Sequence, residues 1–158
     1  DLGSMEELQS KIKKVPHHEQ QTLCNTRPAY RQGRKLTAVK VYTVSQESKY
    51  LLIHNVPSIN LKTELERECR KFGKVSYVEP LKDYPAEQFT EVYVAKYERI
   101  ISARHAKRKL DTRGFYGACL HVCYAAELET LMETREKLNN RRMEVEIRNK
   151  SADKPKSN

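Results

Sequence analysis

Several signatures of common protein classes are missing from the sequence. No apolar run approaches the roughly 20 residues that a membrane-spanning helix needs, so we expect no membrane partner. The four cysteines fall in no Cys-x-x-Cys pair, and we interpret them as reduced thiols of an intracellular protein. Catalytic patterns are also missing: the sequence has no Ser, His and Asp order, no zinc-protease histidine pair and no glycine loop for phosphates. We therefore expect no enzyme activity, no metal and no cofactor.

The charge of the chain is strongly one-sided. The chain contains 30 Lys+Arg and 21 Asp+Glu, which gives a formal net charge of +9. Such an excess favours a polyanionic partner, and nucleic acid is the commonest one for basic proteins. The densest run of one sign is 20–44, which holds five basic residues and no acid.

The length of 158 residues allows one domain with tails. We expect residues 1–36 to form a flexible basic arm, with residues 1–4 as a cloning remnant ahead of Met5. The other expected parts are a domain with an extra preceding strand over 37–126, an amphipathic helix over 127–148 and a disordered tail over 149–158.

Hydrophobic periodicity predicts the order of the elements in that domain. Period-two patterns indicate strands over 38–44 and 50–56, which could pair as a hairpin, and further strands over 75–81, 90–97 and 120–125. Helical spacing indicates one helix from Leu61 to Phe72, ended by Gly73, and a second from Ala103 to Leu110. The order is β-α-β-β-α-β, that of ferredoxin-like α+β sandwiches.

Three local patterns in this region resemble the RNA recognition motif (RRM) family. Residues 51–56, Leu-Leu-Ile-His-Asn-Val, are similar to the first-strand hexamer of that family. Lys-Phe-Gly-Lys-Val at 71–75 resembles its link from the first helix to the second strand, and the spacing of small and apolar residues over 103–125 resembles its second helix and last strand. The resemblance covers about 49–126 and implies an RRM sandwich.

The resemblance also identifies the positions where RNA bases would stack, and none of them is aromatic. In the family's third-strand octamer the third and fifth residues face RNA. Aligned on Tyr97, the octamer begins at Thr90, so these positions are Val92 and Val94, and the stacking position of the hexamer is Leu52. Period-two geometry sends the alternate octamer residues toward the helices: Tyr93, Ala95 and Tyr97.

An aliphatic patch at the stacking positions would be an interaction surface if it were exposed. Three coverings remain open: the chain's own extra strand or C-terminal helix, a protein partner, or RNA. Direct RNA contact is the least favoured, because stacking on an aromatic ring contributes about 1–3 kcal/mol per base and no ring is available. The candidate protein-interaction residues are Leu52, Val92, Val94, Leu128, Leu131 and Met132.

RNA contacts are expected mainly in the basic arm, with a merely solvated arm as the alternative. Arginines interleaved with a tyrosine suit phosphates and one stacked base. The polar edge of the sheet supplies further candidates. The candidate RNA-binding residues are Arg27, Tyr30, Arg31, Arg34, Lys35, Lys40, Tyr42, His54, Lys96, His121 and Tyr124.

Three other patterns have less specific interpretations. A second basic cluster lies on or beside the second helix and is either a solvated face or a contact for an acidic protein or more RNA. Residues 113–115, Arg-Gly-Phe, are similar to a loop of RRM-like domains that bind tryptophan ligands. Cys119, His121 and Cys123 alternate near His54, but the roughly 6.6 Å between alternate residues of a strand disfavours a zinc site.

A closer resemblance extends from about His17 to Leu138 and includes the arm. It is carried by Cys-Asn-Thr-Arg at 24–27, Ala-Val-Lys-Val-Tyr-Thr at 38–43, Tyr-Pro-Ala-Glu at 84–87 and His-Val-Cys-Tyr-Ala at 121–125. By these residues the chain resembles the RNA-binding protein 48 family. The resemblance implies a nuclear splicing factor of the minor spliceosome that contacts the 5′ end of a U6-class small nuclear RNA, with an armadillo-repeat protein and other spliceosome components as partners. The rival interpretation is a protein-interaction scaffold without RNA readout.

Overall fold

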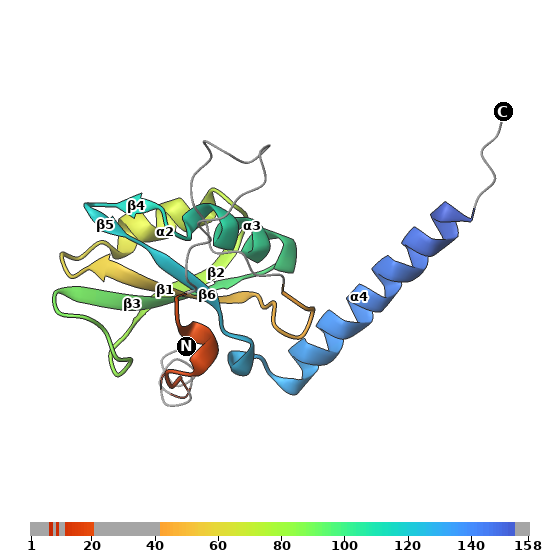
Figure 1. Ribbon diagram of the computed structural model, residues 1–158, viewed down its shortest axis with the longest axis horizontal. Helices are drawn as coiled ribbons and strands as arrows, with labels where there is room; N and C mark the ends of the chain where they lie inside the picture. The colour runs from red at the N-terminus through yellow and green to blue at the C-terminus, as the bar shows by residue number, and fades with distance from the viewer. Residues whose placement is uncertain (1–6, 8, 10–11, 21–41, 154–158) are drawn as a thin grey trace, which may run out of the picture.

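The computed structural model describes residues 7, 9, 12–20 and 42–153. Its centre is a four-stranded antiparallel sheet in the order β2-β3-β1-β6, with two helices against one face (Figure 1). The elements of this sandwich are β1 (Tyr50–Pro57), α2 (Lys62–Arg70), β2 (Val75–Leu81), β3 (Thr90–Tyr97), α3 (Ile100–Leu110) and β6 (His121–Tyr124). The expected α+β ferredoxin-like fold is confirmed.

Short elements and one long helix complete the described chain. They are η1 (Pro16–His18), the hairpin strands β4 (Gly114–Phe115) and β5 (Ala118–Cys119), η3 (Ala126–Leu128) and α4 (Leu131–Ala152). Figure 1 shows α4 projecting from the sandwich rather than lying on it. Within the described ranges, no helix is both long and apolar enough to cross a membrane.

The first core lies between the sheet and the two helices. Tyr93, Ala95 and Tyr97 point into it from β3, as the alternation of the octamer predicts. The Tyr97 hydroxyl donates to the carbonyl of Cys69 in α2, O to O 2.7 Å, which satisfies the one polar atom of a fully buried ring. Gly73 joins α2 to β2 with φ at +150°, and a Cβ there would lie 2.1 Å from Ser102 Oγ of α3. Glycine is therefore required where the two helices approach.

A second core covers the opposite face of the sheet. Leu52, Val92 and Val94 are 0, 2 and 0% exposed, and Leu52 lies opposite Val94 in the β1–β3 ladder. The residues packed over them come from three short segments: Ile12, Tyr84 and Leu128 are the main ones. The expectation of an aliphatic outer face is correct, but the chain itself buries it.

Of the coverings expected from the chain itself, Leu128 does lie over the outer face, but Leu131, Met132 and a strand at 42–44 do not. Residues 42–44, the end of the expected extra strand, form no strand, and the rest of that strand lies outside the described residues. The face is covered by η3 and by residues 12–18, which were expected to belong to a flexible arm. Burying Ile12 and pairing His18 compensates for ordering this segment.

The C-terminal helix also differs from the expectation. It begins at Leu131 rather than 127, because Thr130 and Glu133 form a capping box that fixes the start of the helix. It continues to Ala152, into the expected tail. None of the α4 residues, all of them described, is buried, and Leu131 and Met132 are 68 and 79% exposed.

Candidate functional site

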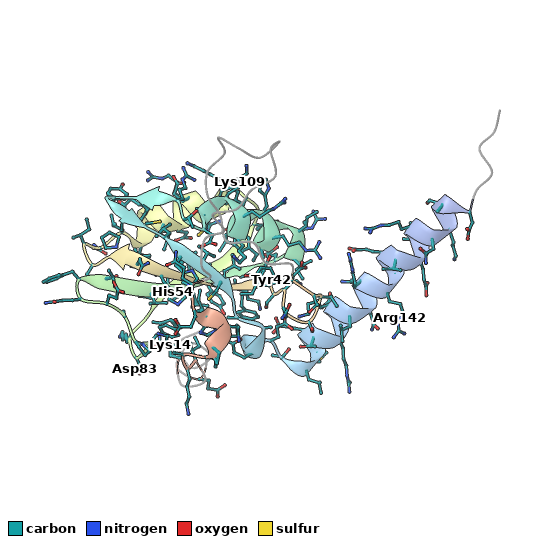
Figure 2. The ribbon with its side chains drawn as sticks, in the orientation of Figure 1. Lys14, Tyr42, His54, Asp83, Lys109 and Arg142 are labelled. Atoms are coloured by element: carbon teal, nitrogen blue, oxygen red, sulfur yellow. The ribbon has the colours of Figure 1, made fainter. Side chains whose placement is uncertain are left out.

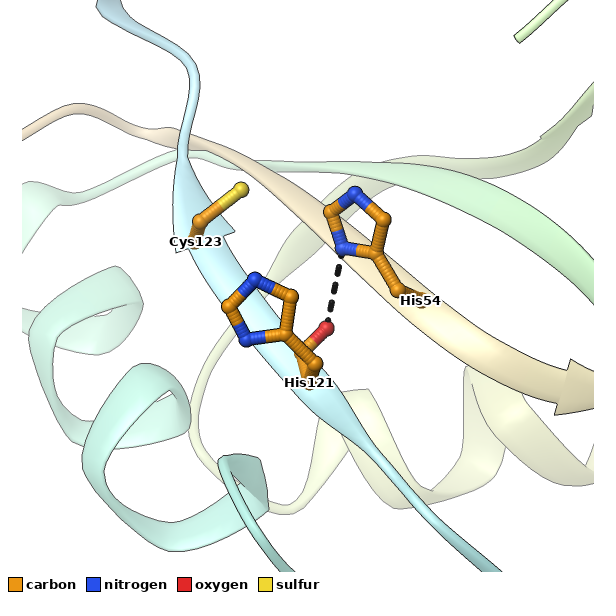
Figure 3. A group of neighbouring side chains, drawn as sticks. All are labelled: His54, His121 and Cys123. Atoms are coloured by element: carbon orange, nitrogen blue, oxygen red, sulfur yellow. Dashed lines mark hydrogen bonds between the residues drawn. The ribbon is translucent and has the colours of Figure 1, made fainter. Parts of the chain in front are cut away.

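Four of the five histidines gather at one end of β1 and β6. His54 and His121 lie opposite each other in the ladder, and Figure 3 shows His54 Nδ1 donating to the His121 carbonyl at 3.1 Å. With Nδ1 protonated, His54 Nε2 accepts from the Tyr84 hydroxyl at 3.2 Å. Tyr84 thus joins the loop after β2 to this cluster.

His18 fastens the N-terminal segment to the same cluster. Its side chain is fully buried. Its Nδ1 lies 2.8 Å from Tyr84 Oη, its Nε2 lies 2.5 Å from Glu127 Oε1, and its carbonyl accepts from His121 Nε2 at 2.6 Å. A buried histidine is stable only when its ring nitrogens are satisfied, and here both are. These bonds join residues more than sixty positions apart.

The cluster shifts the pKa values of its members in opposite senses. Burial, reinforced by the nearby charges of His121, His18 and Lys14, lowers the pKa of His54 to about 4. Burial raises the pKa of Glu127, but the hydrogen bond from His18, a backbone hydrogen bond and the electrostatic effect of His18 and His17 together outweigh it, so the pKa of that carboxyl is below its usual value. His54 is therefore a neutral hydrogen-bonding ring at physiological pH, beside an ionised Glu127.

Two groups of side chains in the cluster meet the spacing of metal ligands. His54, His121 and Cys123 form one group, and His17, His18 and Glu127 form the other. Their atoms are already engaged: both ring nitrogens of His54, Nε2 of His121 and both of His18 have partners. Burial also raises the pKa of the Cys123 thiol, which opposes the thiolate that a metal would bind. The donor set fits a hydrogen-bonded network better than a metal centre.

A pair of tyrosines, Tyr42 and Tyr124, lies on the helix side of the β6 edge, on the opposite side from the histidines. The Tyr42 and Tyr124 rings meet edge to face with centroids 5.0 Å apart, and Lys107 Nζ lies 5.2 Å from the Tyr42 centroid. Tyr124 belongs to the helix-side core, so it does not share the outer face with His54 and His121, contrary to our expectation. The period of the strand explains this, because residues three apart face opposite sides.

Three cavities follow the edge of β6 and connect the two groups. A cavity of about 230 Å³ is lined by His18, His54, Tyr84 and His121, and one of about 250 Å³ by His17, Tyr42 and Tyr124. A third of about 30 Å³ lies between them and shares residues with both. Figure 2 labels His54 and Tyr42, which line the two larger cavities. We call this surface the β6 furrow, formed by His17, His18, Gln20, Tyr42, His54, Tyr84, His121 and Tyr124.

The furrow brings together four of the residues predicted to bind RNA: Tyr42, His54, His121 and Tyr124. Gln20 and Tyr42, which flank the basic run over 21–41 in the chain, both line the smallest cavity. Lys96 lies elsewhere, 3.8 Å from Glu133 at the base of α4 and over the Tyr50 ring. The other predicted RNA-binding residues lie outside the described residues: Arg27, Tyr30, Arg31, Arg34, Lys35 and Lys40.

The predicted protein-interaction residues separate into two groups. Leu52, Val92, Val94 and Leu128 are buried in the second core, so in this structure they present no surface to a partner. Leu131 and Met132 remain exposed on the first turn of α4. Of the predicted protein-interaction residues, only Leu131 and Met132 are therefore exposed.

The other two sequence patterns are occupied by internal contacts. In the second basic cluster, Arg104 pairs with Glu47 at 2.6 Å and Lys107 with Asp111 at 3.3 Å. Arg113 lies 3.0 Å from Glu68, and Phe115 is buried in the helix-side core. A tryptophan ligand would have to break this ion pair and displace a core side chain.

Sequence reasoning missed His17, His18, Tyr84 and Glu127. His17, His18 and Tyr84 lie in no periodic segment, Glu127 is only the first residue of the expected C-terminal helix, and their contacts join distant parts of the chain. The adjacent histidines at 17–18, directly after Pro16, were the available signal. A histidine pair in an otherwise solvated arm has no local reason to be there.

The curated relatives of the chain agree in name. No protein-family model matches it. RNA-binding protein 48 of Danio rerio is 50% identical over 138 residues, which cover 87% of this chain. RNA-binding protein 48 of Homo sapiens is 50% identical over 129 residues, or 82% of this chain, and that of Mus musculus is 48% identical over 126. The chain belongs to the RNA-binding protein 48 family. It spans about a third of these relatives, 38, 35 and 34% of their lengths.

Solved structures of similar shape are RRM domains. The third RRM of Mip6 is 18% identical and covers 50% of this chain and 94% of its own, with a TM-score of 0.44. The Rna15 RRM with bound RNA (GU) is 14% identical and covers 58% of this chain and 98% of its own, also with a TM-score of 0.44. The fold assignment itself rests on the strand order and the placement of the helices.

Proposed function

We propose that the chain binds RNA through the β6 furrow and the basic arm that adjoins it, not through the sheet face. The observation that carries the proposal is that Gln20 and Tyr42, which flank the arm, line one cavity beside His121. The described residues on either side of the basic run over 21–41 therefore both lie at the furrow. The name of the family's curated members also supports RNA as the ligand.

The arm and the furrow suit different parts of the RNA, because their side chains differ in chemistry. Arginine and lysine side chains of the arm would neutralise phosphates, which contributes affinity without sequence preference. The furrow offers aromatic rings and the neutral imidazole of His54, which suit bases rather than phosphates. His54 fits this role because its lowered pKa keeps it uncharged.

The biological setting is part of the same proposal. We place the protein in the nucleus, as a non-enzymatic splicing factor of the minor spliceosome. Its RNA would be the 5′ end of a U6-class small nuclear RNA, bound together with an armadillo-repeat protein and other spliceosome components. The exposed apolar residues of α4 are where we expect that protein partner to dock: Leu131, Met132, Leu138, Met143, Val145 and Ile147.

The test is charge removal in the arm, measured by RNA affinity against salt concentration. For five phosphate contacts on single-stranded RNA, log K falls with log salt at a slope of about −3.5. The triple variant Arg27→Ala, Arg31→Ala, Arg34→Ala should reduce that slope by about 2 and weaken binding at every sequence. The RNA is a single-stranded oligonucleotide with the 5′ sequence of the U6-class RNA.

A matched control removes the same charge from a remote position. Arg141, Arg142 and Arg148 lie on α4, and their triple alanine variant has an equal change in net charge. Its RNA affinity should be close to that of the wild type. Equal affinity of the arm variant and the wild type at all salt concentrations would contradict the proposal.

The rival function, a protein-interaction scaffold, is favoured by the exposed apolar side chains of α4. The double variant Leu131→Asp, Met132→Asp should abolish capture of the armadillo-repeat protein and leave RNA binding intact if both functions exist. A scaffold alone would lose the partner in this variant and show no salt-dependent RNA affinity in any variant.

A further inference from the structure

The cavity beside Tyr42 and Tyr124 differs from the other two in its lining. Aromatic rings form part of its wall, and the polar groups at its rim belong to His17, Gln46 and Glu127. Its volume of about 250 Å³ is below the roughly 300–1,000 Å³ of pockets for drug-sized ligands. A single planar ring system suits this size better than a larger molecule.

We propose that this cavity is a subsite for one nucleobase of single-stranded RNA, stacked on Tyr42. The inference rests on the proposed RNA-binding function and names the ligand of one part of the furrow. It places base recognition on the helix side of the β6 edge, away from the sheet positions that hold Leu52, Val92 and Val94.

The orientation of Tyr42 supports stacking. Its ring lines both this cavity and the smallest one, whereas Lys107, which lies over the ring, lines only the smallest. Lys107 therefore does not line the proposed subsite. Edge-to-face contact with Tyr124, at an interplanar angle of 77°, holds the ring in place. A ring fixed before the base arrives loses little conformational entropy on binding.

The rim can read the edge of a base. Gln46 Oε1 accepts from the Thr43 backbone N–H at 3.0 Å, which fixes the amide by its oxygen and leaves the nitrogen as the donor for a ligand. The Glu127 carboxylate is held by His17 and His18 at 2.9 and 2.5 Å, so both of its oxygens are already engaged. These groups form a donor and acceptor rim around an aromatic wall, which is how proteins recognise unpaired bases.

The experiment is an abasic scan combined with substitution of Tyr42. An eight-nucleotide single-stranded RNA is made with one abasic site at each position in turn, and its affinity is measured by fluorescence anisotropy. At one position the abasic site should weaken wild-type binding by about 5- to 100-fold, the usual effect of losing one base stack. In Tyr42→Leu the same abasic site should have almost no further effect.

Five variants make the result specific. Tyr42→Phe keeps the ring and should keep the loss at the same abasic site, and Tyr116→Leu removes a 60% exposed tyrosine from the β4–β5 turn and should bind normally. Ser45→Leu fills the cavity rim at an exposed position and should reproduce the loss without touching the ring. Tyr42→Leu should leave the salt slope unchanged, whereas the arm variant Arg27→Ala, Arg31→Ala, Arg34→Ala reduces it.

The outcomes separate this inference from the proposed function. If RNA binds with the expected salt slope but every abasic site acts equally in wild type and Tyr42→Leu, the nucleobase subsite is wrong and the RNA-binding function stands. If Tyr42→Leu weakens only the protein partner, the cavity holds an aromatic side chain of that partner and the subsite is again wrong. If no RNA binds at any salt concentration, both fall together.

Discussion

The two faces of the sheet are both buried, but by different kinds of structure. On one face α2 and α3 supply Leu65, Cys69, Ala103 and Ala106 from regular helical turns. On the other face isolated residues of short segments, among them Ile12 and Leu128, cover the positions where RRMs bind bases. A face that is an RNA platform in one member of a fold can be a second core in another, and it then offers no surface on which a base can stack.

The largest effect is expected from a charge placed in the second core. Val92→Asp should lower the free energy of unfolding by about 3–5 kcal/mol, because Val92 is 2% exposed and a carboxylate there has no partner. Val92→Phe should cost only about 1–3 kcal/mol through overpacking. Urea denaturation measures both. Equal tolerance of the two substitutions would mean that this face is open in solution.

The sequence predicts the two faces of β3 but not what covers them. Alternation over two residues is a local property of a strand, so Val92 and Tyr93 are assigned to opposite sides without knowledge of the fold. Ile12 and His18 belong to no periodic pattern, and His18 is buried only through partners at Tyr84 and Glu127. Such long-range pairing cannot be deduced from neighbouring residues.

The β6 furrow, like the two faces of β3, could be predicted only in part. His54 and His121 were placed near each other because paired strands can be aligned from their motifs. Tyr42 and Tyr124 were both named as candidates, but their edge-to-face contact depends on how residues 42–49 return to the sheet. The start of α4 was readable from Thr130 and Glu133, three residues apart around an apolar pair, whereas apolar spacing alone set the expected start at 127.

Truncation of one residue in each cover sharpens the comparison between the two cores. Leu65→Ala in α2 should cost about 3–5 kcal/mol of unfolding free energy, because Leu65 is fully buried between sheet and helix. Ile12→Ala should cost about 2–3 kcal/mol, since Ile12 is 6% exposed and its segment can relax around the cavity.

Native-state hydrogen exchange shows which elements each substitution destabilises. Ile12→Ala should speed exchange mainly in η1 and the strand ends beneath it, while Leu65→Ala should speed exchange throughout the sheet. If Ile12→Ala costs less than about 0.5 kcal/mol, the N-terminal segment is not part of the core.

The pH dependence of stability tests the histidine cluster that holds the N-terminal segment against the outer face of the sheet. Because burial lowers the pKa of His54 to about 4, the unfolded chain binds more protons than the folded chain between pH 6.5 and 4. The stabilisation is therefore present above pH 6.5 and is lost as pH falls through this window, by about 2–3 kcal/mol. Glu127 and Asp111, whose pKa values are also lowered, lose their contribution at still lower pH.

The control for the pH experiment is His54→Gln, which cannot titrate. Its unfolding free energy should be lower than that of the wild type at pH 7. Between pH 6.5 and 4 that free energy should change less with pH than it does in the wild type. A His105→Gln variant, on the helix side beside Phe72, should keep the wild-type slope. An unchanged slope in His54→Gln would assign the pH dependence to another group.

The smallest effect concerns α4, which contacts the sandwich only near its first turns. Glu133 accepts from the Tyr50 hydroxyl at 3.0 Å and completes the capping box with Thr130, so Glu133→Ala should cost about 1 kcal/mol of unfolding free energy. Glu144, three turns further along, makes only a surface pair with Arg141 at 3.3 Å, and Glu144→Ala should cost less than about 0.5 kcal/mol. Urea denaturation of the two variants compares the same substitution at the start of one helix and three turns along it. Similar losses of unfolding free energy would mean that the far part of α4 packs on the domain in solution. The helix would then help to bury the sandwich, in addition to the segments that cover the two faces of the sheet.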